Sequence, residues 1–159
     1  MEENLILLPY PRRLEFSAGE LTLAGRRIIQ LACPQPQDLL LSAGRLQAAL
    51  KKAAGLDWEL NASPALPAEQ VGLTLELDPG CPGGGQGYRL LIDEGGMRIQ
   101  AQAATGVFYG VCTLIQILQQ RGPRLPCLSI EDYPDFLARG VMMDISRDKV
   151  PGMQTLYEL

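Results

Sequence analysis

Residues 134–151 read PDFLARGVMMDISRDKVP. The short apolar run at 141–145 is bounded by turn residues, which is typical of a strand buried on both faces. The residues after Pro151, GMQTLYEL, have a helical pattern that continues to Leu159. A buried parallel strand followed by a helix makes a βα unit, the repeating element of α/β folds. We therefore expect one complete domain before this segment, followed by the first strand and helix of a second.

The residues before this segment predict an α+β domain. Alternating apolar residues and turn signals indicate short strands, and two longer stretches have helical spacing. We expect strands at 4–8, 13–16, 20–23, 27–31, 56–61, 71–77, 88–92 and 97–101, hairpin turns at 17–19 and 93–96, and helices at 38–54 and 105–120. This order favours a mostly antiparallel sheet with two helices packed on one face.

The two expected helices differ in their expected burial. The first has Asp38 where an N-cap belongs and Gly55 where a left-handed C′ residue belongs. The second is apolar nearly all round, which is typical of a helix buried on more than one side. Gly106 and Gly110 lie about one turn apart on it and permit the close approach of another backbone. We expect this helix to lie between its own sheet and something outside the domain.

A glycine-rich stretch, DPGCPGGGQG at 78–87, has the weakest helix or strand signal in the sequence. A phosphate-binding loop would need a helix directly after the glycines, and usually a lysine. A strand pattern follows instead, so we interpret the stretch as a mobile hairpin loop.

Composition and charge argue against several classes of function. The net charge is −4, the pI is about 4.8 and no basic run exceeds two residues, so nucleic acid is not an expected partner. No segment approaches the ~20 apolar residues of a membrane span, so no membrane partner is expected. The N-terminus MEENLILLPYP is acidic where a signal peptide is basic, which predicts a cytoplasmic protein.

The cysteine and histidine counts argue against a metal site. The chain has 4 widely scattered cysteines and no histidine, so we expect no zinc and no cofactor. The lack of histidine also removes Ser-His and Cys-His catalysis within the chain.

Three motifs occur in order over the C-terminal third of the chain. A helix motif, Thr-Gly-x-x-Tyr-Gly-x-x-Thr-Leu-x-Gln, precedes an Asp-x-Pro-x-Phe turn, and then come Arg-Gly and Asp-x-Ser-Arg. The residues that match are Thr105, Gly106, Tyr109, Gly110, Thr113, Leu114, Gln116, Asp132, Pro134, Phe136, Arg139, Gly140, Met142, Met143, Asp144, Ser146 and Arg147. With these motifs the chain resembles the family 20 glycoside hydrolases, the β-N-acetylhexosaminidases.

The resemblance implies a division of the chain. Residues 1–133 would be the N-terminal, non-catalytic α/β domain, and residues 134–159 the first βα unit of a truncated (β/α)8 catalytic barrel. The barrel would be the intramolecular partner that covers the second helix. A chain cut here leaves that helix and the 141–145 strand uncovered, so we expect the fragment to self-associate.

The resemblance also implies a reaction and a substrate contact. Family members hydrolyse a terminal β-linked N-acetylhexosamine with retention, and the substrate's own acetamido oxygen attacks the anomeric carbon. The Asp-Glu pair that assists this attack lies further along the family's barrel, so no catalytic residue is expected here. Arg139 matches the Arg that binds hydroxyls of the terminal sugar, and Asp144 and Arg147 rank below it as candidates. An ion pair of Arg139 with Asp135 or Asp144 is the alternative interpretation.

Two other functions remain open at this point. The chain could be a stand-alone binding or scaffold module with no enzyme attached, or the accessory domain of another glycosidase family. The sequence beyond Leu159 distinguishes these hypotheses from a β-N-acetylhexosaminidase.

Overall fold

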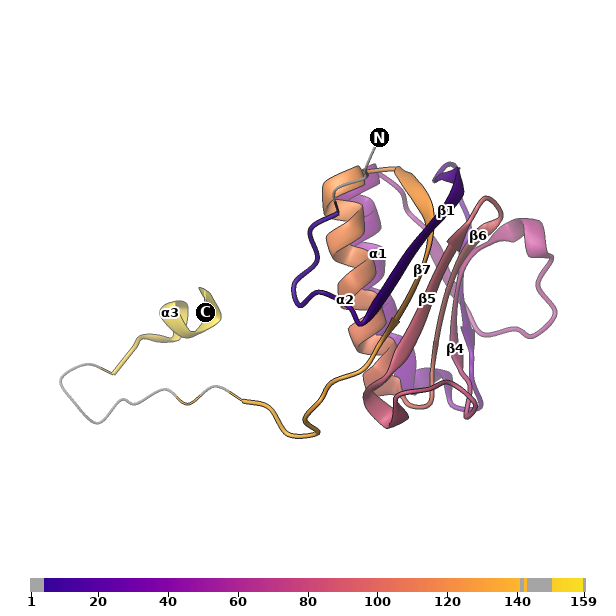
Figure 1. The fold of residues 1–159 in the computed structure, drawn as a ribbon. Coiled ribbons are helices and arrows are strands. Elements are labelled where there is room, and N and C mark those ends of the chain that lie inside the picture. The colour runs from indigo at the N-terminus through magenta and orange to yellow at the C-terminus, as the bar shows by residue number, and fades with distance from the viewer. Residues whose placement is uncertain (1–4, 141, 143–149, 159) are drawn as a thin grey trace.

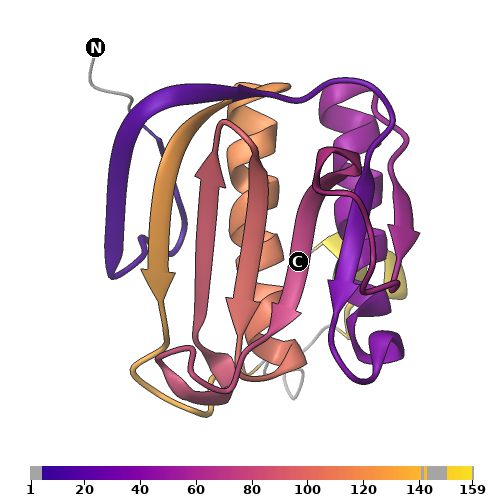
Figure 2. The same ribbon diagram turned by 90° about the vertical axis from the view of Figure 1, so that its right-hand side faces the viewer.

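The computed structural model describes residues 5–140, 142 and 150–158. Within these residues, one sheet of seven strands is covered on one face by two helices (Figures 1 and 2). The strands are β1 (Arg13–Thr22), β2 (Ile28–Ala32), β3 (Glu59–Asn61), β4 (Val71–Leu77), β5 (Tyr88–Asp93), β6 (Gly96–Ala101) and β7 (Arg124–Asp132). The covering helices are α1 (Leu40–Ala54) and α2 (Ala104–Arg121), while the short helix α3 (Met153–Glu158) lies apart from the sheet.

The sheet is mixed, with strand order β1-β7-β5-β6-β4-β2-β3. The pairs β1–β7, β7–β5 and β5–β6 are antiparallel, and the pairs β6–β4, β4–β2 and β2–β3 are parallel. Parallel neighbours need a crossover connection, and α1 supplies one between β2 and β3. The α+β class and the helices on one face are therefore confirmed. The parallel half of the sheet was not part of the expectation.

Both expected helices are confirmed, and their ends are informative. Gly55 has a left-handed backbone, with φ of +69°, and its N–H bonds to the carbonyl of Lys51, so it ends α1 as expected. Asp38 is not a cap, because it lies inside a short 3-10 turn, Pro36–Leu39, that leads into α1. None of the helices in the described ranges is long and apolar enough to cross a membrane.

Several strand predictions are wrong. The expected hairpin around 17–19 is one continuous strand, β1, whose register against β7 shifts between Phe16 and Glu20. Gly19 there has φ of +110°, so the turn-like residues form a bulge. Strand β7 was missed altogether, although it lies between β1 and β5 in the interior of the sheet.

The glycine-rich stretch is not a hairpin loop. It joins β4 to β5, and β6 lies between those two strands in the sheet. The stretch includes a short 3-10 turn, Gly84–Gln86, and it packs beside the N-terminal end of α2. The hairpin expected at 93–96 is confirmed, since β5 and β6 pair directly and Asp93 accepts the N–H groups of Gly95 and Gly96.

The N-terminal segment at 5–12 is not a strand, and it lies alongside α2 (Figure 1). The side-chain amide of Gln120 accepts the N–H of Ile6 at 3.0 Å and donates to its carbonyl at 2.7 Å. Gln116, one turn earlier, makes the same pair of bonds with Leu8, at 2.9 and 3.1 Å. These amides satisfy the backbone as a neighbouring strand would, and they leave the side chains of Ile6, Leu8 and Tyr10 exposed.

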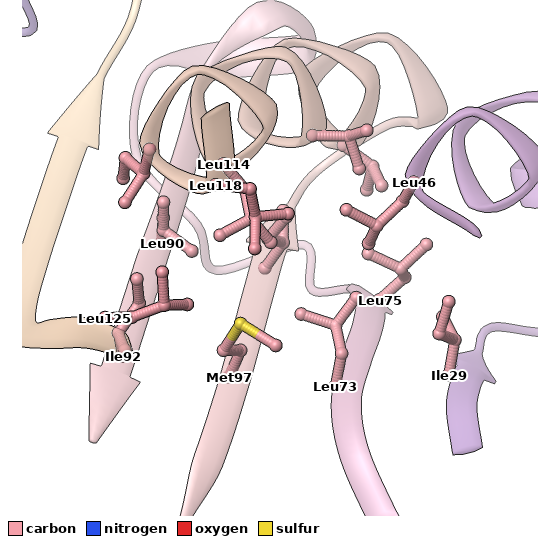
Figure 3. Close-up of a cluster of buried hydrophobic side chains, with 14 of the residues drawn as sticks. Ile29, Leu46, Leu73, Leu75, Leu90, Ile92, Met97, Leu114, Leu118 and Leu125 are labelled. Atoms are coloured by element: carbon pink, nitrogen blue, oxygen red, sulfur yellow. The ribbon is translucent and has the colours of Figure 1, made fainter. Parts of the chain in front are cut away.

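A single apolar core fills the space between the sheet and the two helices (Figure 3). Leu46 of α1 lies close to Leu75 of the sheet, while Leu114 and Leu118 of α2 lie beside Leu90. Ile29 and Ile92 belong to the same core. All of these side chains are buried.

The two motif glycines of α2 are packing residues, as expected. A Cβ at Gly106 would overlap the carbonyl oxygen of Gly87 and lie 2.8 Å from the Cβ of Ala101. A Cβ at Gly110 would lie 2.7 Å from the Cγ2 of Ile99. The helix therefore lies against the start of β5 and against β6 at a distance that only glycine allows.

Candidate functional site

A pocket of about 500 Å³ opens where the chain leaves the sheet at the end of β7. Its walls come from the N-terminal segment, from one face of α2 and from the residues after β7. It is lined by Leu8, Pro9, Tyr10, Arg12, Gln86, Tyr88, Tyr109, Cys112, Thr113, Gln116, Asp132, Tyr133, Pro134, Asp135, Phe136 and Arg139.

Helix α2 forms one wall because three of its motif residues recur at helical spacing. Tyr109, Thr113 and Gln116 are separated by four and three residues and so share one face of the helix. The hydroxyl of Thr113 lies 2.6 Å from the hydroxyl of Tyr88, which reaches across from β5. Burial raises the pKa of Tyr88 to about 12, so this phenol is neutral at pH 7 and serves as a structural hydrogen-bonding group.

Arg12 ties the N-terminal segment to the residues that follow β7. Its backbone N–H donates to Oδ1 of Asp132 at 3.2 Å, and its Nε donates to the carbonyl of Tyr133 at 2.8 Å. Its guanidinium also pairs with Asp135 and lies 4.2 Å from the centre of the Tyr133 ring. The hydrogen bond to Asp135 raises the pKa of the Arg12 guanidinium, which stays charged.

Arg139 lies at the mouth of the same pocket. Its Nη2 donates to the hydroxyl of Tyr109 at 3.0 Å, and its Nη1 donates to the carbonyl of Phe136. The guanidinium carbon is 5.5 Å from the centre of the Tyr109 ring. Asp135, one of the two alternative partners expected for Arg139, pairs with Arg12 instead. The other expected site residues, Asp144 and Arg147, lie outside the described residues, as does most of the expected strand at 141–145.

The adjacent carboxylates at the end of β7 make separate interactions. Glu131 accepts from Nε of Arg89 at 3.1 Å, and Asp132 accepts from the backbone of Arg12. Neighbouring residues of a strand point to opposite faces of a sheet, so these two carboxylates do not converge on one bond. Within the described ranges, no group of three or more His, Cys, Asp or Glu side chains is placed to hold a metal ion.

This fold and these motif contacts agree with a known family. A sequence model described as glycosyl hydrolase family 20, domain 2, matches residues 4–133. The chain belongs to this family.

Relatives of this family 20 domain carry hexosaminidase names. A beta-N-acetylhexosaminidase of Cellulomonas fimi is 28% identical over 148 residues, which cover 91% of this chain and 29% of the relative. A beta-hexosaminidase of Porphyromonas gingivalis is 27% identical over 157 residues, covering 92% of this chain and 19% of the relative. The family 20 chain thus spans less than a third of either protein.

A solved structure matches the fold in the same way. It is a mutant beta-hexosaminidase of Streptomyces plicatus in complex with its product (GlcNAc). The TM-score is 0.70 at 27% identity, and the match covers 87% of this chain and 28% of the other.

Within the family 20 domain, the motif residues recognised in the sequence have identifiable positions. Gly106 and Gly110 seat α2 on the sheet, Gln116 holds the N-terminal segment, and Asp132 holds Arg12. Arg12 and Gln86 line the pocket but were not singled out from the sequence. No local pattern marks them, because their partners lie 120 and 51 residues away.

Proposed function

We propose that this chain is the small, non-catalytic domain of an exo-acting β-N-acetylhexosaminidase, joined to the start of its catalytic barrel. The observation that carries the proposal is the family 20 match over residues 4–133, together with hexosaminidase relatives that are several times longer than this chain. On this proposal, residues 1–133 form the small domain and residues 134–159 begin the barrel.

The proposed reaction is hydrolysis of a terminal β-linked N-acetylhexosamine with retention. The substrate's acetamido oxygen attacks the anomeric carbon, an Asp orients that group, and an adjacent Glu protonates the leaving oxygen. Water then attacks the anomeric carbon, gives a proton back to the Glu and breaks the bond to the acetamido oxygen, so the two displacements together retain the configuration. Both carboxylates belong to the barrel beyond Leu159, so the 159-residue chain itself has no hydrolytic activity on this proposal. The reaction needs no metal or cofactor.

Arg139 is the proposed contribution of this chain to substrate binding. A guanidinium has five N–H donors in a fixed plane, which suits neighbouring sugar hydroxyls. Two of the donor nitrogens of Arg139 are engaged by Tyr109 and Phe136, and its remaining N–H groups pair with none of the described residues. Asp144 and Arg147 remain predicted contacts of lower rank, and the cytoplasmic location remains a prediction from the sequence.

The proposed partner of the α2 side of the domain is the barrel. Ile6, Leu8 and Tyr10 present exposed apolar side chains beside α2, and Leu8 and Tyr10 also line the pocket. Without the barrel, we propose that this surface joins a second copy of the chain. A stand-alone module or an accessory domain of another glycosidase are the competing functions, and neither is favoured by an observation of this chain.

An aryl N-acetyl-β-glucosaminide is the substrate for the test. The longer protein of this proposal, in which a barrel follows residue 159, is expected to turn it over, and the 159-residue chain is expected to show only the rate of the buffer blank. An aryl β-glucoside is the matched control, because it lacks the acetamido oxygen that acts as nucleophile, and it should not be hydrolysed. A longer protein without activity, or an active 159-residue chain after repurification, contradicts the proposal.

A further inference from the structure

The residues that follow β7 are held by the small domain along their length. Arg12 binds the carbonyl of Tyr133 and the side chain of Asp135. Further on, Nε2 of Gln86 donates to the carbonyl of Leu137 at 2.9 Å. The last of these contacts is the bond between Tyr109 and Arg139. This stretch is therefore held against the domain from Tyr133 to Arg139.

The Tyr109–Arg139 contact has two parts that act on the same guanidinium. The phenol oxygen accepts from Nη2 at 3.0 Å, and the ring face lies 5.5 Å from the guanidinium carbon. Tyr109 is itself fixed, since it is half-buried on a helix that the motif glycines seat on the sheet and its ring meets Phe108 edge-on at 6.0 Å. A rigid helix residue thus restricts the orientation of an exposed and otherwise adaptable side chain.

We propose that Tyr109 is a positioning residue for Arg139 and that the small domain thereby takes part in binding the terminal sugar. The inference rests on the proposed function, in which Arg139 contacts sugar hydroxyls. Tyr109 touches no substrate in this scheme. Its hydroxyl orients the guanidinium plane, and the N–H groups of Arg139 that face away from Tyr109 and Phe136 are left for the substrate.

The chemistry of the pair suits this role. A phenol oxygen accepts a hydrogen bond from a cation without forming an ion pair, so the charge of the guanidinium is retained for the substrate. Asp135 would neutralise that charge, but Arg12 engages it. The small domain therefore places an Arg at the mouth of the pocket and also removes the carboxylate that would compete for it.

The test uses the longer, active protein and the substitution Tyr109→Phe, which keeps the ring and removes the hydroxyl. We expect kcat/KM to fall about 5-fold, because a hydrogen bond to a charged group orders Arg139 for the sugar. The thermal unfolding midpoint should stay within about 2 °C of the original, because the lost bond is exposed.

Tyr88→Phe is the matched control. It removes a phenol hydroxyl from the wall of the same pocket, but this hydroxyl bonds Thr113 and is buried. We expect the opposite pattern, with a lowered unfolding midpoint and kcat/KM within about 2-fold of the original. A loss of kcat/KM in Tyr88→Phe equal to that in Tyr109→Phe would overturn the proposal, because general loosening of the pocket would explain both.

A double-mutant cycle separates this inference from the proposed function. If Tyr109 acts through Arg139, then Tyr109→Phe has no further effect on kcat/KM in an Arg139→Ala background. The positioning role is overturned if Tyr109→Phe causes its full loss of kcat/KM in the Arg139→Ala background as well. It is also overturned if Tyr109→Phe leaves kcat/KM unchanged while Arg139→Ala lowers it.

Two further outcomes bear on the proposed function instead. An unchanged kcat/KM for folded Arg139→Ala overturns the proposed role of Arg139. A longer protein with no hydrolysis at all refutes the proposed function before any variant is compared.

Discussion

Gly106→Ala is expected to lower the free energy of unfolding of the domain by about 3 kcal/mol, near the upper end of the usual range for overpacking. The added Cβ would overlap the carbonyl oxygen of Gly87 and also meet the Cβ of Ala101. The nearest atom belongs to backbone, so no side-chain rotation relieves the clash, and α2 has to move away from the sheet. Urea denaturation of the 159-residue chain, followed by circular dichroism, measures the change as a lower midpoint.

Gly44→Ala is the matched control for this substitution. Gly44 lies within α1, is exposed, and has no atom within 4 Å of an added Cβ. Alanine in a helix interior is more stable than glycine by about 0.5–1 kcal/mol, so this variant should unfold at slightly higher urea. An unchanged midpoint for Gly106→Ala would contradict the close approach of α2 to Gly87 and β6.

The 159-residue chain is expected to dimerise. Its average mass in solution should rise from that of one chain to that of two as the concentration increases. The reason is the row of exposed apolar side chains beside α2, in which Leu8 has 82% of its surface exposed. Exposed apolar surface of this kind on a soluble protein marks an interaction site, and a symmetric dimer is the commonest way to cover it. Light scattering over a concentration series measures the mass.

Leu8→Glu tests which surface joins the two copies. The Leu8 backbone holds Gln116, and the substitution leaves those bonds in place while adding a charge to the apolar row. We expect this variant to be monomeric. Leu91→Glu is the control, because Leu91 is also partly exposed. It lies opposite Arg98 in the β5–β6 pair, on the face of the sheet that the two helices do not cover. A wild-type chain that stays monomeric at all concentrations, or a Leu91→Glu variant that is equally monomeric, contradicts the expected dimer.

The helices and the central strands could be predicted because local signals determine them. The apolar spacing of α2 and the glycine that ends α1 lie within single elements, and β4, β5 and β6 carry clear alternation. The N-terminal segment misled the prediction. Its side chains alternate as in a strand, but its backbone groups are satisfied by glutamine amides 114 and 108 residues away. Pattern alone does not distinguish that arrangement from a strand.

The bulge on β1 explains why both β7 and the continuous course of β1 were missed. Pro126 lies within β7, and a proline argues against a central strand because it has no N–H to donate. In this sheet Pro126 pairs with Glu20, directly beside the register shift between Phe16 and Glu20 on β1. The ladder is already interrupted there, so the missing donor is tolerated. A bulge on one strand thus explains both the turn-like signal at 17–19 and the proline opposite it.

The candidate site was partly predictable. Tyr109, Gln116 and Asp132 belong to motifs that the sequence displays, and they meet at one pocket in the structure. Their roles in holding the N-terminal segment and the residues after β7 came only from the structure, because Arg12 and Gln86 act across long sequence separations. Its motif predicts Arg139 as a substrate contact. The bond from Arg139 to Tyr109 was not predicted, because it joins two motifs at residues 30 positions apart.

The anomeric form of the first product tests the central functional proposal most directly. The longer protein is incubated with an aryl N-acetyl-β-glucosaminide, and proton NMR follows the anomeric signal of the released N-acetylglucosamine from the first minutes. Retention through the acetamido group predicts that the β-anomer appears first and then converts slowly to the equilibrium mixture. The α-anomer as the first product, or the absence of hydrolysis, would contradict the assignment of this chain to a retaining β-N-acetylhexosaminidase.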